Sequence, residues 1–288
     1  MSETPIPIAI PIVPMGPGSQ PDEADGVELD ILQLPSGMST YAAPPLPEPE
    51  QVEDLTQAKH CLNELLGLLQ GYRNSWTASQ LDLIDLDGAD LELIDQVLGE
   101  GEVSLVFAGD RRVRIQESVL AGVWRIRIDD AEGRRLQDLV EVAPIPRLIR
   151  ESTFESASER VGMEARYIPQ GVLNAPPLLA EINDKLALPG GEPHVINLTL
   201  LPQTEQDLAF LGERLGRGPV TILSRGYGNC RITSTATRHV WWVQYFNSQD
   251  RNILNSLEIT PVPEVACAAP EDIRDSAERL AEILELYR

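Results

Sequence analysis

The residues that could carry catalysis or bind a metal are few and scattered in this chain. Its three cysteines are Cys61, Cys230 and Cys267, and no CxxC pair occurs among them. Its three histidines are His60, His194 and His239, which lie in unrelated segments. A zinc or iron–sulfur site needs several thiolate or imidazole ligands, usually at short fixed spacings. We therefore expect no metal and no cofactor, and we interpret the cysteines as buried free thiols.

Sequence signatures of the common enzyme classes are also absent. The chain contains no GxSxG, HExxH or GxxxxGK[ST] motif, and no GxGxxG follows a strand-like segment. Residues 85–88 read DLDG, but the later ligands and the closing glutamate of a calcium loop do not follow. We assign no catalytic residue and expect a protein that is not an enzyme, although a triad assembled only in the fold would leave no such signature.

Two segments instead carry residues suited to contacting a partner. In the first, WWVQYF at 241–246, strand alternation places Trp242 and Phe246 on the face opposite Trp241. The matching residues earlier in the chain are Arg125 and Asp129, so aromatic side chains replace charges on an open face. Large exposed apolar patches mark interfaces. The pattern indicates a contact with the other half of the chain, with the N-terminal arm or with a partner protein.

The second candidate is the turn at residues 226–231. It contains the candidate residues Gly226, Tyr227, Gly228, Asn229 and Arg231. Paired glycines can form a nest of backbone N–H donors that binds an anion. They are also expected, and more commonly found, in a hairpin turn that requires a positive φ angle. Both interpretations of the turn stay open at the level of the sequence.

The net charge of the chain limits the kinds of molecule that it is expected to bind. The 288 residues include 45 acidic and 23 basic side chains, a formal net charge of −22. Nucleic acids and anionic membrane surfaces require a basic footprint, so we expect neither as a partner. An acidic protein attracts basic partners over long range, although the same charge also serves solubility. No stretch has the length and apolarity of a membrane span, and the N-terminus MSET has no basic signal-peptide region, so we expect a cytoplasmic protein without membrane insertion.

An internal repeat organises the elements that position these segments. A shift of 117 positions without a gap places Leu98-Gly99 on Leu215-Gly216 and Val123-Trp124 on Val240-Trp241. The same shift places Pro144 on Pro261 and Pro146 on Pro263. A gapless match of this length indicates duplication of one structural unit.

Each unit has the pattern of helices followed by short strands. Leucines at helical spacing predict a first helix over 54–70, matched by 175–187. Asp87 and Thr204 have the pattern of N-caps with an acid three residues later, and the second helices should end at Gly99 and Gly216. Strand cores are expected at 103–107, 113–117, 123–129 and 139–142, and at 220–224, 230–235, 240–246 and 257–259. A last helix is expected from about Glu271 to Tyr287.

The predicted fold class is α+β, with two tandem copies of a helix plus antiparallel β-meander unit. Residues 1–52 form an extended, acidic, Pro-rich arm in this interpretation, because prolines alternate with isoleucines from Pro5 to Pro14. Residues 53–150 form repeat unit 1, residues 151–170 a linker, and residues 171–288 repeat unit 2.

Several motifs of the chain resemble the HupH/HyaF/HoxQ family of hydrogenase expression proteins, whose C-terminal type matches unit 2. The motifs are GPGSQP at 16–21, LGEGEVS at 98–104, NLT at 197–199, GYG at 226–228, HVW at 239–241, PVPEV at 261–265, APED at 269–272 and DSA at 275–277.

The resemblance implies a maturation chaperone for nickel–iron uptake hydrogenases. It implies that the partners are the precursor of the iron–sulfur small subunit, with its twin-arginine signal peptide for export, and a thioredoxin-like hydrogenase chaperone. An acidic surface facing an arginine-containing signal peptide would be electrostatically complementary. The alternative reading is a protein that handles iron–sulfur or metal cofactors during hydrogenase assembly.

Overall fold

The computed structural model describes residues 46–73, 76, 78–109, 111–163, 168–188, 192–226 and 228–287. Most of the predicted arm, residues 1–45, and the candidate Tyr227 lie outside the described residues. The helical elements are η1 (Pro49–Gln51), α1 (Thr56–Gly71), α2 (Gly88–Leu98), α3 (Arg147–Ser152), α4 (Ala175–Leu186), η2 (Leu198–Leu200), α5 (Glu205–Leu215), η3 (Glu264–Ala266) and α6 (Pro270–Leu286). The strands are β1 (Ser79–Asp82), β2 (Val103–Phe107), β3 (Arg112–Glu117), β4 (Val123–Asp129), β5 (Arg135–Val142), β6 (His194–Asn197), β7 (Val220–Ser224), β8 (Asn229–Ser234), β9 (Val240–Phe246) and β10 (Asn252–Ile259).

The described strands form one antiparallel sheet with the order β1-β5-β4-β3-β2-β7-β8-β9-β10-β6. The sequence predicts two small sheets, whereas the structure joins the two meanders where β2 pairs with β7. Five elements of the first half, α2 and β2 to β5, recur as α5 and β7 to β10 with both bounds shifted by 117 residues. At the junction Leu105 faces Ile222, its own counterpart under that shift. The two halves therefore meet as two subunits do across a local two-fold axis.

Local signals set the ends of the second helix in each half, as predicted. The Asp87 side chain accepts hydrogen bonds from the backbone N–H groups of Ala89 and Asp90. Thr204 forms a capping box with Asp207. The helices end at Gly99 and Gly216, which adopt φ angles of 53° and 65°.

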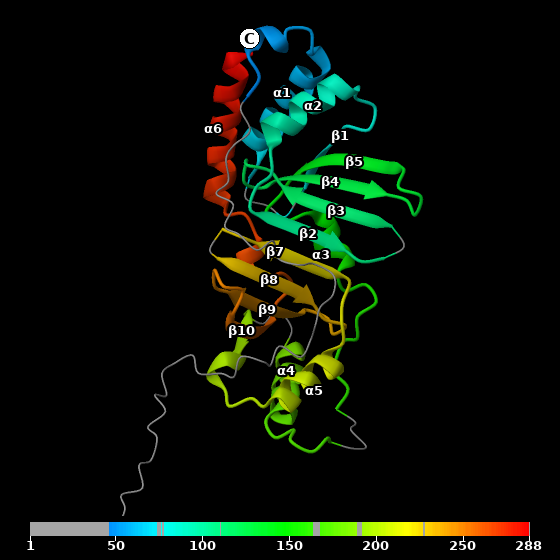
Figure 1. The fold of residues 1–288 in the computed structure, drawn as a ribbon, viewed down its shortest axis with the longest axis vertical. Helices are drawn as coiled ribbons and strands as arrows, with labels where there is room; N and C mark the ends of the chain where they lie inside the picture. The colour runs from blue at the N-terminus through cyan, green and yellow to red at the C-terminus, as the bar shows by residue number, and fades with distance from the viewer. Residues whose placement is uncertain are drawn as a thin grey trace, which may run out of the picture.

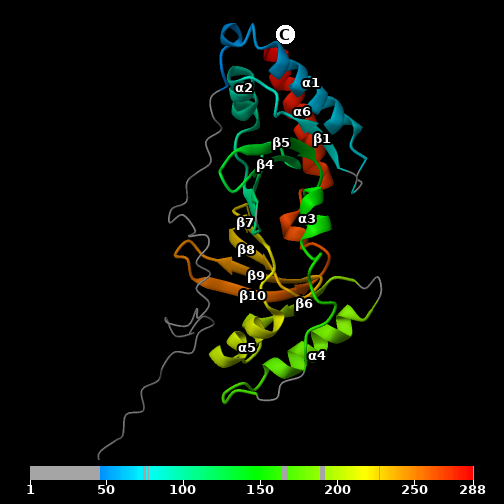
Figure 2. The ribbon, with the colours of Figure 1, turned by 90° about the vertical axis from the view of Figure 1, so that its right-hand side faces the viewer.

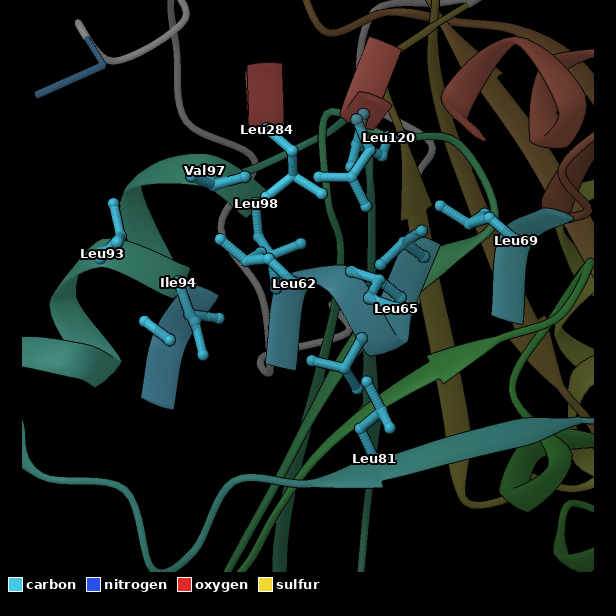
Figure 3. Close-up of a cluster of buried hydrophobic side chains, with 14 of the residues drawn as sticks. Leu62, Leu65, Leu69, Leu81, Leu93, Ile94, Val97, Leu98, Leu120 and Leu284 are labelled. Atoms are coloured by element: carbon cyan, nitrogen blue, oxygen red, sulfur yellow. The ribbon is translucent and has the colours of Figure 1, made fainter. Parts of the chain in front are cut away.

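Helices cover the same face of the sheet at its two ends. Figure 1 shows α1, α2 and α6 gathered at one end of the molecule and α4 and α5 at the other. The short α3 lies beside the middle of the sheet (Figure 2), where Ile149 and Phe154 belong to the central hydrophobic cluster. In Figure 3, leucines of α1 and α2 meet those of β1 and α6. Among the described residues no helix combines the length and apolarity needed to cross a bilayer.

Two segments pack across the predicted domain boundaries at residues 150 and 171. Helix α6 follows the second half in sequence, yet Ile273 and Leu280 are buried in the cluster formed by α1, α2 and β1. The predicted linker carries buried Val161, whose backbone N–H and C=O both bond the Asn183 side chain of α4. Each half is thus covered by the segment that follows the other half, and the linker is part of the core.

Candidate functional site

The two equivalent tryptophans of β4 and β9 form the centre of the fold. Trp124 and Trp241 are both fully buried. The Trp124 Nε1–H donates to the carbonyl of Ala143 at 2.8 Å, and Trp241 Nε1–H donates to the carbonyl of Thr260 at 3.2 Å. These hydrogen bonds satisfy the one polar atom of each indole ring. Trp241 therefore faces the core, as the strand alternation predicts.

Trp242, the first candidate contact residue, packs within the chain. It is half-buried against the cluster under α4 and α5, and its Nε1–H donates to Oδ1 of Asn255. A methyl group at Gly212 of α5 would lie 3.8 Å from its ring. In the first half the corresponding positions hold Arg125 and Asp138, joined by two hydrogen bonds of 2.6 and 2.9 Å. The second half replaces an ion pair by an aromatic contact in the same place.

Phe246, the second candidate, is buried and has the same kind of counterpart. The guanidinium of Arg231 lies 5.2 Å from the centre of the Phe246 ring, within cation–π range. The corresponding pair in the first half is Arg114 with Asp129, at 3.0 Å. Both aromatic side chains thus contact elements of their own half of the chain, rather than the other half, which was one of the contacts that the sequence left open. A contact of these two residues with a partner stays a prediction.

The candidate turn connects β7 to β8 at the surface. Gly226 and Gly228 are exposed, and Gly228 has a φ of 102°, which is a left-handed conformation that favours glycine. Asn229 and Arg231 belong to β8, where they face Phe246 and Gln244 of β9. The positive φ of Gly228 fits the hairpin interpretation of that glycine.

The turn contacts Glu102, one of three acids that we call the acidic corner, namely Glu102, Glu117 and Asp272. The Arg225 N–H donates to the Glu102 carbonyl at 3.1 Å, and a methyl group at Gly226 would lie 2.1 Å from Oε2 of Glu102. Glu117 is buried, and its Oε1 accepts the Gly122 N–H at 3.2 Å. Burial raises the pKa of Glu117 to about 7, and the negative charges of Glu102 and Asp272 add to the shift.

Sequence reasoning did not group these three acids. They lie on three separate elements, so their spacing carries no signal. In the counterpart of this corner two positions are uncharged, with Pro219 at the position of Glu102 and Ser234 at that of Glu117, whereas Glu155 stands at the position of Asp272. Ser234 Oγ there accepts the Val220 N–H at 2.9 Å. Of the two equivalent glycines, Gly226 thus lies beside a carboxylate, that of Glu102, whereas Gly109 has no atom within 4 Å of a Cβ placed on it.

The cysteines and histidines lie apart from this corner. Burial raises the pKa of the Cys230 and Cys267 thiols to about 12, so both are protonated at neutral pH. His194 bonds Glu181 at 2.7 Å, while the His239 ring packs edge-on against Phe154. Within the described ranges, no three His, Cys, Asp or Glu side chains come together in a way that could hold a metal ion.

In a comparison with known protein families, the same family model matches both halves of the chain. The family model "HupH hydrogenase expression protein, C-terminal conserved region" matches the chain twice, at residues 55–163 and 172–287. The chain belongs to the HupH hydrogenase expression protein family.

Similar HupH-family proteins cover almost the whole chain. Hydrogenase expression/formation protein HoxQ of Cupriavidus necator is 49% identical over 96% of this chain and 96% of its own length. Hydrogenase expression/formation protein HupH of Rhodobacter capsulatus is 47% identical over 97% and 98%. Hydrogenase-1 operon protein HyaF of Escherichia coli K12 is 34% identical over 94% of each chain. A solved structure of HupH from Thiobacillus denitrificans is 34% identical, covers 39% of this chain and 93% of its own, and has a TM-score of 0.35.

Proposed function

We propose that this protein is a non-enzymatic chaperone in the maturation of a nickel–iron uptake hydrogenase. In this proposal it binds the iron–sulfur small-subunit precursor in the cytoplasm before twin-arginine export, alongside a thioredoxin-like hydrogenase chaperone. The observation that carries the proposal is the match to hydrogenase expression/formation proteins along nearly the full chain. The two matches of the family model, and the recurrence of five elements at one shift, further support descent from a duplicated unit.

The charge of the surface supports a basic partner. The chain carries 45 acidic against 23 basic residues, and the exposed Glu102 lies beside the turn at Gly226. Carboxylates beside an exposed turn attract lysine or arginine side chains and speed their encounter. We place the precursor contact at this turn because Trp242 and Phe246 are occupied within the chain.

Co-purification tests the proposal directly. Tagged protein should capture the small-subunit precursor, and capture should weaken as salt increases because attraction between exposed charges is screened. Precursor lacking its signal peptide should bind more weakly. If neither form is captured at low salt, the chaperone function is wrong.

A matched pair of glycine variants tests the position of the contact. In Gly226→Val the new side chain would displace the Glu102 carboxylate from the turn, whereas a Cβ at Gly109, its counterpart, meets nothing within 4 Å. We expect Gly226→Val to weaken precursor capture by roughly tenfold, and Gly109→Val to leave it unchanged. Equal capture by both variants would place the contact elsewhere.

Metal content separates the chaperone from the alternative cofactor-handling function. We expect anaerobically purified protein to contain no stoichiometric iron, nickel, zinc or sulfide, since among the described residues no three potential ligands come together and the Cys230 and Cys267 thiols are protonated. Elemental analysis and a sulfide assay make the measurement. A bound cluster that is lost on substitution of Cys61, Cys230 or Cys267 would instead support cofactor handling.

A further inference from the structure

The last strand of the sheet, β6, leaves one backbone edge unpaired in the described structure. Two hydrogen bonds show which backbone groups of β6 point away from the sheet. One is made by Asn255 of β10 and the other by Thr260, the residue that follows β10. Thr260 N–H donates toward β9, to His239 O, and Asn255 N–H donates to the opposite side, to Thr199 Oγ1. Backbone groups alternate along a strand, so odd-numbered residues of β10 bond β6. They face His194 and Ile196, so the N–H and C=O of Val195 point outward from the sheet.

Val195 also presents an apolar side chain beside an acid. Val195 is 55% exposed, and it faces Glu258 of β10 in the register of the sheet. Since neither residue of this pair bonds the other's backbone, their side chains lie close together on one face. Burial raises the pKa of Glu258, and no hydrogen bond or ion pair from another described residue reaches its carboxylate.

The carboxylate of Glu141, the counterpart of Glu258 in the first half, is instead held by hydrogen bonds. Glu141 is fully buried, and its carboxylate accepts hydrogen bonds from the Arg147 N–H at 2.6 Å and from Gln80 Nε2 at 2.5 Å. The edge strand there, β1, carries Asp82, and a charged residue on an edge discourages further pairing. The edge at β6 instead carries Val195, and Leu200, 79% exposed, follows it in η2.

We propose that the β6 edge binds an extended segment of a partner polypeptide as an additional strand, with an apolar residue beside Val195 and a lysine or arginine directed at Glu258. The added strand would lie about 10 Å from β10, two strand spacings, which arginine and glutamate side chains span together. Backbone pairing supplies the affinity in this mode of recognition, and side chains supply the specificity. That the segment belongs to the hydrogenase precursor rests on the proposed function above.

A proline at position 195 provides the sharpest test. Val195→Pro removes the outward N–H while sparing the bonds to β10, a position where sheets tolerate proline. Val195→Leu is the matched control, because it keeps both the N–H and the apolar character. The probe is a capped, fluorescently labelled synthetic peptide with the repeat Val-Ser-Arg-Ser, which places valine and arginine on the same face of a strand, and binding is measured by anisotropy. We expect Val195→Pro to weaken binding about tenfold, and Val195→Leu to change it less than about twofold.

Two further variants keep the test decisive if the proline variant does not fold. Val195→Lys preserves every backbone group but repels a cationic segment, and Glu258→Gln removes the charge. Each should weaken peptide binding several-fold and reduce its salt dependence. No peptide binding by the wild type, or equal binding by all variants, would overturn the edge site. Precursor capture unaffected by Val195→Pro would contradict the edge site alone, whereas peptide binding without precursor capture would contradict the proposed function alone.

Discussion

Replacing Trp241 by alanine is expected to lower the free energy of unfolding by roughly 3–5 kcal/mol. The side chain is fully buried at the centre of the sheet, and Phe154 packs edge-on against it with ring centres 5.2 Å apart. Truncation would leave a large cavity and would also leave the Thr260 carbonyl without its indole donor. Urea denaturation followed by circular dichroism gives the measurement.

Trp242→Ala is the matched control for this prediction. Trp242 is the neighbouring residue on the opposite face, half-buried against α5 and bonded to Asn255. We expect its removal to cost about 1–2 kcal/mol, because fewer of its contacts are lost. Equal losses for the two variants, or a larger loss for Trp242→Ala, would contradict the prediction, because they would mean that the contacts of Trp242 with the cluster of α4 and α5 stabilise the fold at least as much as those of Trp241 in the central cluster.

Features fixed by nearby residues were the ones that the sequence predicted well. Asp87, Thr204, Gly99 and Gly216 set helix ends through hydrogen bonds and backbone angles within a few residues. Alternation along β9 placed Trp241 in the core for the same reason. The shift of 117 then transferred each assignment to the other half.

Features that depend on packing between distant segments escaped the sequence. The pairing of β2 with β7 joins segments that each look like an edge strand when considered alone. The apolar stripe of α6 is the same whether it covers the second half or, as observed, the first. From the sequence alone Trp242 is predicted to be an exposed aromatic residue. Its partial burial depends on Gly212 of α5, whose missing side chain leaves room for the indole ring. The acidic corner combines three distant elements, so only the fold brings its members together.

Asp207 is the buried acid on which the second half most depends. It is fully buried at the start of α5, and its Oδ1 accepts the backbone N–H groups of Leu173, Asn174 and Ala175 at 2.8–2.9 Å. Its Oδ2 accepts the N–H and the hydroxyl of Thr204. Burial alone would raise the pKa of Asp207, but the hydrogen bonds from Thr204, Ala175 and Asn174 outweigh it and lower the pKa from 3.8 to about 2.

Asp207→Ala should therefore lower the free energy of unfolding by roughly 3–5 kcal/mol at pH 7, since it leaves several buried N–H groups without an acceptor. Because the folded-state pKa lies below the unfolded one, the contribution of the carboxylate is complete above about pH 4 and is lost as the pH falls toward 2. The difference between wild type and variant should thus be about 1 kcal/mol smaller at pH 3 than at pH 7. Asp90→Ala, which removes the counterpart acid and its hydrogen bond from the Ala58 N–H, should cost less. Urea denaturation at both pH values makes the measurement, and a difference that does not change between them would mean that Asp207 is not the charged acceptor that joins α4 to α5.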